Sequence, residues 1–366
     1  VSRTAVSMLY GLSRLEGGVE GPIVGRLIDR VGPRWIIMAG AGLTGLGFLI
    51  LSHAQNYLSV LIIFVSAIAL GYNAGFYHPI STAVNSWFIR RRAISFAILD
   101  AVGSLGAMVL VPLLSYWVLA LGWRTGATMA GLITLAVVLP LALVMHRSPE
   151  SRGLQPDGPP LAGSPDQMRV DFGVRQAVGT SSFWLLTLAT TLRLSVSTAL
   201  AAHMVPILVW RGMAEGLAAY GVSLFAFGGI VTPLVFGWLG DRYSKTRLSA
   251  LGAAVTAAGL LLLFRSTSPS LLYLLPLATA VALGTAPLNW SLLGDYFGRT
   301  SYGSLRGWMR IANGIGAFIF PVGAGWLFDR TASYSLVLLL FAIVLIVSAL
   351  LFLRLRHPVQ AAHPVS

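Results

Sequence analysis

The chain has 366 residues, of which 56% are hydrophobic and only 10% are charged, and its mean hydropathy is +0.79. Soluble domains contain about 45–50% apolar and about 25% charged residues, so this composition excludes a soluble globular protein, and its apolar content excludes a disordered chain. The net charge of +13 comes from basic residues that lie in short clusters between apolar runs, which indicates membrane topology rather than nucleic-acid binding.

Eleven apolar runs approach or exceed the length of about 20 residues that crosses a hydrocarbon core. In chain order they are 5–26, 35–53, 58–86, 93–119, 125–145, 183–208, 217–239, 248–264, 271–294, 307–328 and 334–353. The segment 147–181 is rich in proline and charge, so we expect a polar linker with little regular structure. The predicted organisation is a helical half at 1–146, the linker at 147–181 and a second helical half at 182–366.

An internal repeat relates the two halves. Residues 25–34 read GRLIDRVGPR, and residues 237–242, about 210 positions later, read GWLGDR. Asp241 is preceded by two spans within its half, whereas the sequence before Asp29 has room for one. This difference predicts that one span is missing from the front, so the visible spans are numbered helices 2 to 12 of a twelve-helix protein.

The basic clusters predict the orientation in the membrane. Most of them follow helices 2, 4, 6, 8, 10 and 12, and the positive-inside rule places that side in the cytoplasm. The C-terminus is then cytoplasmic. Lys245 is the only lysine, and such arginine-rich usage favours a bacterial protein, so we expect the bacterial inner membrane as its location. We also expect a monomer.

The duplicated G-x-x-x-D-R pattern after the second helix of each half resembles the signature of the major facilitator superfamily. A finer resemblance is to the branch of monocarboxylate transporters and oxalate:formate antiporters. It rests on Trp87-Phe88-Ile89-Arg90-Arg91-Arg92, on Gly103 and Gly106 downstream, and on the segment 147–158. That branch also has a substrate-binding arginine in helix 8, and residues 217–239 contain none.

The resemblance implies a fold of two six-helix halves and a gate at the cytoplasmic ends. In the superfamily the motif aspartate contacts the positive N-terminal end of helix 11 or an arginine there when the cavity opens outward. The residues that this assigns to the gate are Gly25, Asp29, Arg30, Arg34, Asp241, Arg242, Arg306 and Arg310.

Ionisable residues inside apolar spans are the candidate transport residues, because a charge in the bilayer needs a partner or water. Arg193 in helix 7 and Arg14 in helix 2 lie near mid-depth, and paired guanidinium hydrogen bonds suit a carboxylate. The alternative is that each arginine is neutralised by an acid of the protein. Glu16 and Glu20 share one helical face, and like charges there suit proton coupling, as does Asp100 in helix 5; packing beside Arg14 is the alternative for the two glutamates.

Polar and aromatic residues in helices 4 and 10 complete the candidate substrate site. Tyr72, Asn73, Tyr77 and His78 precede Pro79 in helix 4, and Asn289 and Trp290 lie in helix 10. Polar groups beside a proline break favour a binding site near the midplane. A polar contact between helices is the alternative.

These observations predict a secondary transporter that moves a small organic anion, a mono- or dicarboxylate, by alternating access coupled to protons or to exchange. The alternatives are a proton-coupled exporter of a sugar or drug, and a transporter-like sensor. An ATP-binding G-x-x-x-x-G-K-[ST] run, H-E-x-x-H and G-x-S-x-G are all absent from the sequence, and so is cysteine. We therefore expect no enzyme activity, no cofactor and no metal.

Overall fold

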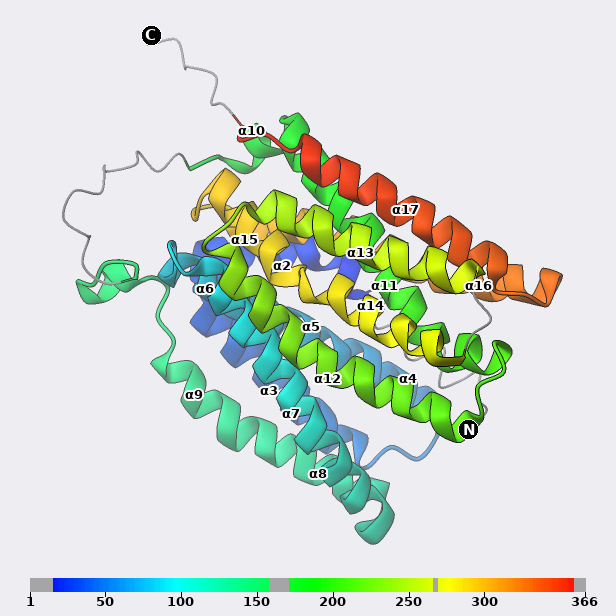
Figure 1. Ribbon diagram of the computed structural model, residues 1–366. Coiled ribbons are helices and arrows are strands. Elements are labelled where there is room, and N and C mark those ends of the chain that lie inside the picture. The colour runs from blue at the N-terminus through cyan, green and yellow to red at the C-terminus, as the bar shows by residue number, and fades with distance from the viewer. Residues whose placement is uncertain (1–15, 158–170, 266–268, 359–366) are drawn as a thin grey trace. The chain divides into compact units, whose positions relative to one another are not determined.

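The computed structural model describes residues 16–157, 171–265 and 269–358, and within these ranges it is helical, with no strand (Figure 1). Arg14 and the first half of the predicted span 5–26 lie outside the described residues. The end of that span is continued by α2 (Gly21–Val31), which has a proline in its first turn and is followed by Gly32 with φ of 95°.

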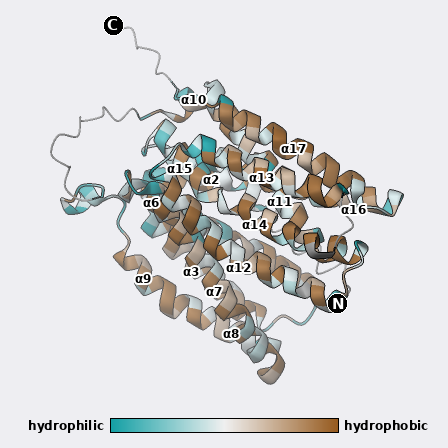
Figure 2. Ribbon diagram, viewed as in Figure 1, coloured by the Kyte–Doolittle hydropathy of each residue, from teal (hydrophilic) through white to brown (hydrophobic). Residues whose placement is uncertain are grey.

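Ten helical segments of the described part are long and apolar enough to cross a membrane. They confirm ten of the predicted spans, with ends that differ by a few residues. The single-helix spans are α3 (Pro33–Leu51), α7 (Arg92–Leu121), α11 (Ser181–Trp210), α12 (Glu215–Gly240), α13 (Lys245–Arg265), α16 (Tyr302–Thr331) and α17 (Ser335–Arg354). Figure 2 shows α17 in apolar colour along nearly its whole length.

Three spans are built from several pieces. One joins α4 (Tyr57–Ile63), the π-helical η1 (Phe64–Ala69), α5 (Leu70–Gly75) and α6 (Tyr77–Trp87). The second joins α8 (Trp123–Ile133), η2 (Thr134–Val138) and α9 (Leu139–Val144). The third joins η4 (Pro269–Tyr273), α14 (Leu274–Gly284) and α15 (Ala286–Phe297).

Two of these breaks have the same physical cause. Pro79 lacks an N–H group and its ring would clash with the carbonyl of Gly75, four residues earlier. Accordingly α5 ends at Gly75, and Phe76 takes φ −109° and ψ −88°. Pro287 follows the break between α14 and α15 in the same way. Main-chain carbonyls near each break are thereby left to accept hydrogen bonds from side chains.

The described part of the linker is more ordered than its proline content suggests. It contains a 3-10 turn, η3 (Pro149–Arg152), and a short helix, α10 (Val174–Val178). Asp157 accepts a hydrogen bond from the Ile89 N–H at 2.6 Å, and the side chains of Phe172 and Ala177 are buried, so polar and apolar contacts both order this segment.

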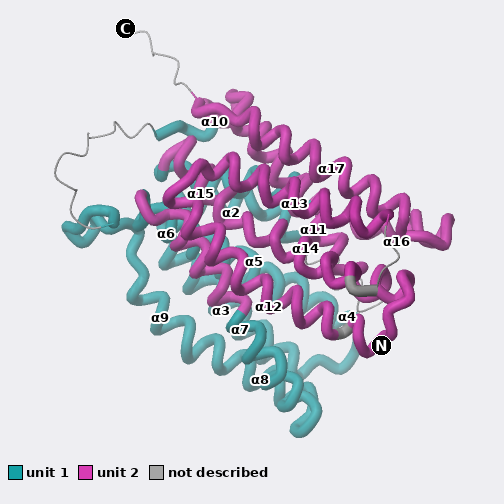
Figure 3. Tube along the Cα trace, viewed as in Figure 1, with its two compact units in different colours: residues 1–89, 105–174, 299–314 teal, residues 90–104, 175–298, 315–366 magenta. Residues whose placement is uncertain are grey.

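The chain divides into two compact units (Figure 3). Unit 1 comprises residues 1–89, 105–174 and 299–314, and unit 2 comprises residues 90–104, 175–298 and 315–366. The first part of α16 therefore belongs to unit 1, and the first part of α7 belongs to unit 2.

Small residues let helices pack closely within each unit. In unit 1, α3 packs against α5 and α8, and a Cβ on Gly71 would lie 2.7 Å from the Gly40 carbonyl oxygen. In unit 2, α13 packs against α17 and α12 against α14. A Cβ on Gly228 would lie 2.5 Å from the Ala280 Cβ. Such contacts suit membrane helices, whose association depends on close packing.

Candidate functional site

Asp29 caps the first turn of α16 within unit 1. Its carboxylate accepts hydrogen bonds from the Gly303 N–H at 2.9 Å, the Ser304 N–H at 2.8 Å and the Ser304 hydroxyl at 2.6 Å. These N–H groups carry the positive end of the helix dipole, which favours an anion. The contact predicted for Asp29 with the start of this helix is therefore present, although Arg306 and Arg310 do not supply it; its gating role stays a prediction.

Asp241 makes the corresponding cap on α7 within unit 2. It accepts hydrogen bonds from the Ala93 N–H at 2.9 Å and the Ile94 N–H at 3.1 Å. Burial raises the pKa of its carboxyl, and the two N–H donors oppose that shift. The expectation that Asp241 faces the start of helix 11 is corrected here, because the repeat pairs it with the start of the helix that is numbered 5 in the sequence.

Glycine faces glycine where α2 meets α16 in unit 1. A Cβ on Gly25 would collide with the Gly303 carbonyl oxygen, and a Cβ on Gly303 would lie 2.7 Å from Asp29 Oδ1. One turn further along, a Cβ on Gly21 would lie 2.7 Å from the Gly307 carbonyl oxygen. The Asp29 cap therefore depends on glycine at these positions.

His78 and Tyr77 also contact α16. The buried ring of His78 donates from Nε2 to the Gly303 carbonyl oxygen at 3.0 Å. The Arg306 guanidinium lies 4.6 Å from the centre of the Tyr77 ring, a cation–π distance. Both residues were predicted to bind substrate, and the structure places His78 beside the Asp29 cap.

A charged cluster, here called the Arg310 cluster, joins α16, α5 and the residues just before α2 within unit 1. Arg310 lies 3.7 Å from Glu20 Oε1 and donates to the Asn73 carbonyl oxygen at 3.3 Å. The Asn73 side chain is a hydrogen-bond partner of Glu16. Both carboxylate oxygens of Glu20 are buried without a hydrogen-bond partner, which leaves the nearby Arg310 charge as the main stabilisation of its ionised form.

A second cluster, here called the Arg193 cluster, lies within unit 2. Arg193 is 1% exposed and donates from Nη1 to the Ala282 carbonyl oxygen. In the amide orientation that satisfies both neighbours, Asn289 accepts from Arg193 Nη2 at 2.8 Å and donates to the Ser249 hydroxyl at 3.2 Å. Asp100 is the acid that stabilises the charge of Arg193.

The two clusters follow the internal repeat. Asn73 and Ala282 occupy equivalent positions, and in each case an arginine donates to a main-chain carbonyl beside a proline break. Asp100 and Arg310 are likewise equivalent by sequence position, and each faces a charge of opposite sign. In each unit, therefore, an arginine donates to one carbonyl at the broken span, and the charge of one acid acts on that arginine.

The remaining predicted residues lie apart from these clusters or at their edges. Tyr72 is 59% exposed and stacks on Phe76, and Trp290 is partly buried on α15. Arg30 is exposed, Arg34 lies 5.4 Å from the Trp35 ring centre, and Arg242 lies 4.0 Å from the Trp238 ring centre. Arg14, predicted to contact substrate, falls outside the described residues.

Several polar contacts were missed by the sequence analysis. Arg92 and Lys245 both bind Asp295, each at 2.5 Å, within unit 2. In unit 1, Glu150 binds the Arg299 guanidinium through both oxygens, at 2.8 and 2.9 Å, and these bonds lower the pKa of Glu150 to about 2. Glu150 and Asp295 each lie within four residues of an arginine in the sequence, and this was the signal that the sequence offered for these pairs.

Comparisons with known proteins agree with this architecture. The model of the Major Facilitator Superfamily matches residues 1–217 and 194–366. Monocarboxylate transporter 11 of Homo sapiens is 26% identical over 367 residues, covering 94% of this chain and 73% of that protein. The Gentisate transporter of Corynebacterium glutamicum is 24% identical over 356 residues, covering 93% of this chain and 78% of that protein.

A solved structure shows the same fold. The Escherichia coli fucose:proton symporter FucP matches with a TM-score of 0.76 at 16% identity, covering 97% of this chain and 92% of that chain. The names of the two relatives above describe them as transporters. The apolar spans, the duplicated aspartate caps and the match over both halves together show that this chain is a multi-pass membrane transporter that belongs to the major facilitator superfamily.

Proposed function

We propose that the protein carries a small organic anion, a mono- or dicarboxylate, across the membrane by alternating access with proton coupling. The observation that carries this proposal is the Arg310 cluster, in which a cation and a buried acid lie 3.7 Å apart. The names of two relatives, which specify a monocarboxylate and gentisate, support a carboxylate as the solute.

Arg310 is suited to receive a carboxylate because its side chain is 23% exposed and its contact with Glu20 is longer than a charge-assisted hydrogen bond. A solute carboxylate that displaced Glu20 would restore a close, planar pairing. Protonation of Glu20 would remove the competing charge, so one proton and one anion would bind together. This exchange of partners couples solute to proton without a further group.

Arg193 remains the anchor predicted from the sequence. Its full burial and its contacts with Ala282 and Asn289 mean that a solute would reach it only after these contacts change. We therefore propose that Arg310 meets the anion first and that Arg193 acts in another conformation of the cycle.

Binding of labelled lactate and labelled gentisate to purified protein tests these roles. Arg310→Gln should weaken binding about tenfold or more, since hydrogen bonds to charged groups contribute about 1.5–3 kcal/mol, whereas Arg310→Lys should weaken it less. In a separate assay of counterflow in proteoliposomes, Arg193→Gln should abolish transport of the same two compounds. Arg330→Gln, which changes an exposed arginine at the other end of the same helix, is the matched control and should leave affinity unchanged.

Glu20→Gln separates coupling from binding. It should bind the anion at least as tightly as the wild type and lose the increase of affinity at low pH. If Arg310→Gln and Arg330→Gln bind carboxylate equally well, the anchor role of Arg310 is excluded. If Glu20→Gln keeps the full pH dependence, the coupling role of Glu20 is excluded.

The orientation and assembly are part of the proposal. We propose a monomer in the bacterial inner membrane with a cytoplasmic C-terminus. The clusters of basic residues at 90–92 and 242–247 support this orientation. A protease site added after residue 358 should be cut from the cytoplasmic side alone.

A further inference from the structure

A pocket of about 430 Å³ lies in unit 2 where α12 ends and α7 begins. It is lined by Arg90, Arg91, Ile94, Trp238, Asp241 and Arg242. Three of the six residues are arginines, and their side chains are exposed. The lining includes one acid, Asp241, whose two oxygens already accept the N–H groups of Ala93 and Ile94. The pocket therefore presents a surplus of positive charge.

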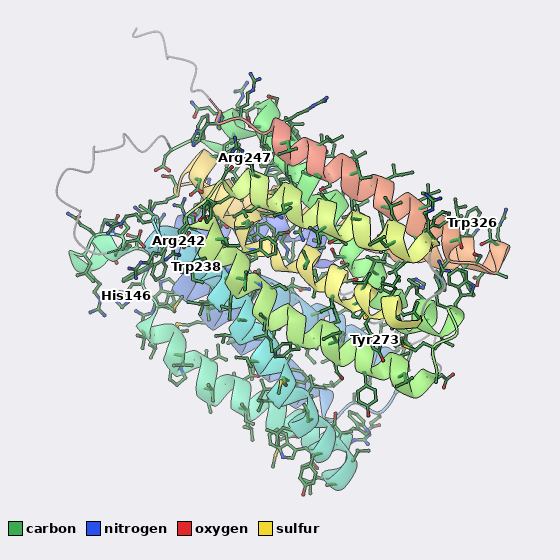
Figure 4. All side chains as sticks on the ribbon, viewed as in Figure 1. His146, Trp238, Arg242, Arg247, Tyr273 and Trp326 are labelled. Carbon is green, nitrogen blue, oxygen red and sulfur yellow. The ribbon has the colours of Figure 1, made fainter. Side chains whose placement is uncertain are left out.

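The position of the pocket along α12 indicates the depth of a lipid headgroup. The apolar span ends at Gly240, and Trp238 lies one half-turn earlier with 50% exposure. Tryptophan prefers the level of the headgroups, and the Arg242 guanidinium lies 4.0 Å from the Trp238 ring centre (Figure 4). Arg242 Nη1 also donates to the Trp238 carbonyl oxygen at 3.1 Å, and the stacking and this bond together hold the guanidinium beside the pocket.

A contrasting pocket in unit 1 shows what neutralises such arginines elsewhere in the described chain. It measures about 300 Å³, and its lining includes Arg147, Arg299 and the acids Asp29, Glu150 and Asp171. Glu150 accepts hydrogen bonds from the Arg299 guanidinium, and Asp171 accepts one from the Thr300 hydroxyl at 2.7 Å. Acids of the linker thus balance the cations in that pocket, whereas the lining of the unit 2 pocket has one acid and three arginines.

We propose that the unit 2 pocket binds the phosphate group of an anionic phospholipid, with Arg91 and Arg242 as its principal ligands. Guanidinium groups match phosphate oxygens in pairs. A bound phosphate would join the start of α7 to the end of α12, the two elements that Asp241 already connects. This inference does not depend on the identity of the transported solute.

The test uses the full chain in a neutral detergent and the short-chain lipid dihexanoyl phosphatidylglycerol. Dihexanoyl phosphatidylcholine serves as the zwitterionic comparison, and inorganic phosphate as the free-ion arm. Phosphatidylglycerol should bind at least tenfold more tightly than phosphatidylcholine. The double change Arg91→Gln with Arg242→Gln should weaken phosphatidylglycerol binding tenfold or more, because each charged hydrogen bond accounts for about one order of magnitude.

The matched control removes two other exposed arginines of unit 2, Arg247→Gln with Arg354→Gln, and should leave the lipid affinity within about twofold. Inorganic phosphate that binds as tightly as the lipid, and is lost in the same double variant, would support the phosphate site with the free ion as its source. Equal binding of the two lipids, or an equal loss in the control variant, would overturn the proposal.

Discussion

Gly25 sets how closely α2 and α16 approach within unit 1. Because a Cβ at this position would collide with the Gly303 carbonyl oxygen, Gly25→Ala should separate the helices and weaken the Asp29 cap. We expect the cost to exceed about 1 kcal/mol, since overpacking against backbone typically costs about 1–3 kcal/mol. Thermal unfolding in detergent measures it.

Gly42→Ala is the matched control for this change. Gly42 lies within α3, and a Cβ there would meet no atom within 4 Å. Alanine favours a helix over glycine by up to about 1 kcal/mol, so Gly42→Ala should raise the unfolding temperature or leave it unchanged. Equal destabilisation by both changes would show that the Gly25–Gly303 contact is not the cause.

The variant Asp29→Asn separates the proposed gate from substrate binding, because the exchange rate and the equilibrium affinity can be measured independently. Asp29→Asn removes the negative charge opposite the Gly303 and Ser304 N–H groups and keeps one acceptor oxygen. We expect exchange across the membrane to slow several-fold while the equilibrium affinity for the anion stays within about twofold, because Asp29 bonds to Gly303 and Ser304, whereas Arg310 contacts Glu20 and the Asn73 carbonyl. A variant with lost affinity and normal exchange would show that Asp29 acts on binding instead.

Sequence reasoning predicted the contact of Asp29 with the start of helix 11 but not the residues that make it, and it placed Glu20 beside Arg14 rather than beside Arg310. The aspartate was visible because its motif is duplicated, whereas Gly303 and Ser304 contribute backbone N–H groups that any residue carries. Arg193 was predicted from its depth alone, and depth does not reveal that Asn289 and the Ala282 carbonyl occupy its guanidinium. Contacts to main-chain atoms leave no signature in residue type.

At the scale of elements, the Glu150–Arg299 pair connects the linker turn η3 to the residues just before α16, within unit 1. The pKa of Glu150 falls from 4.5 to about 2 on folding, so the pair contributes stability above pH 4.5, and this contribution is lost as the pH falls towards 2. The side chain of Glu150 is 49% exposed, so the contribution is small.

Glu150→Gln checks this dependence. The wild type should unfold at a slightly higher temperature than the variant at pH 7, and the difference should shrink between pH 4.5 and pH 3. Ser151→Ala, on the same 3-10 turn, is the control and should show no such trend. A difference between wild type and Glu150→Gln that grows on acidification would contradict the assigned pairing.

The spans themselves were predictable, because ten apolar runs of suitable length correspond to ten helical segments. The breaks were predictable in part. Pro79 and Pro287 mark two of them, since proline has no N–H group to donate to the carbonyl four residues earlier in a helix. The π-helical segments Phe64–Ala69 and Thr134–Val138 contain no residue that signals the change of hydrogen bonding, so they were not expected.

At the scale of the molecule, the internal repeat appears as a reciprocal exchange. Asp29 of the first sequence half caps residues 303 and 304, and Asp241 of the second half caps residues 93 and 94. Each unit is consequently completed by the first part of a helix from the other half of the sequence. We therefore predict that a transport cycle breaks both caps.

The measurement that tests the central claim most directly is counterflow in proteoliposomes containing the full-length protein. Vesicles loaded with unlabelled lactate or gentisate should take up the labelled compound transiently, faster at acidic external pH, and Arg310→Gln vesicles should not. A protein that exchanged a labelled neutral sugar and neither carboxylate, with Arg310→Gln as active as the wild type, would contradict the account of an organic-anion transporter.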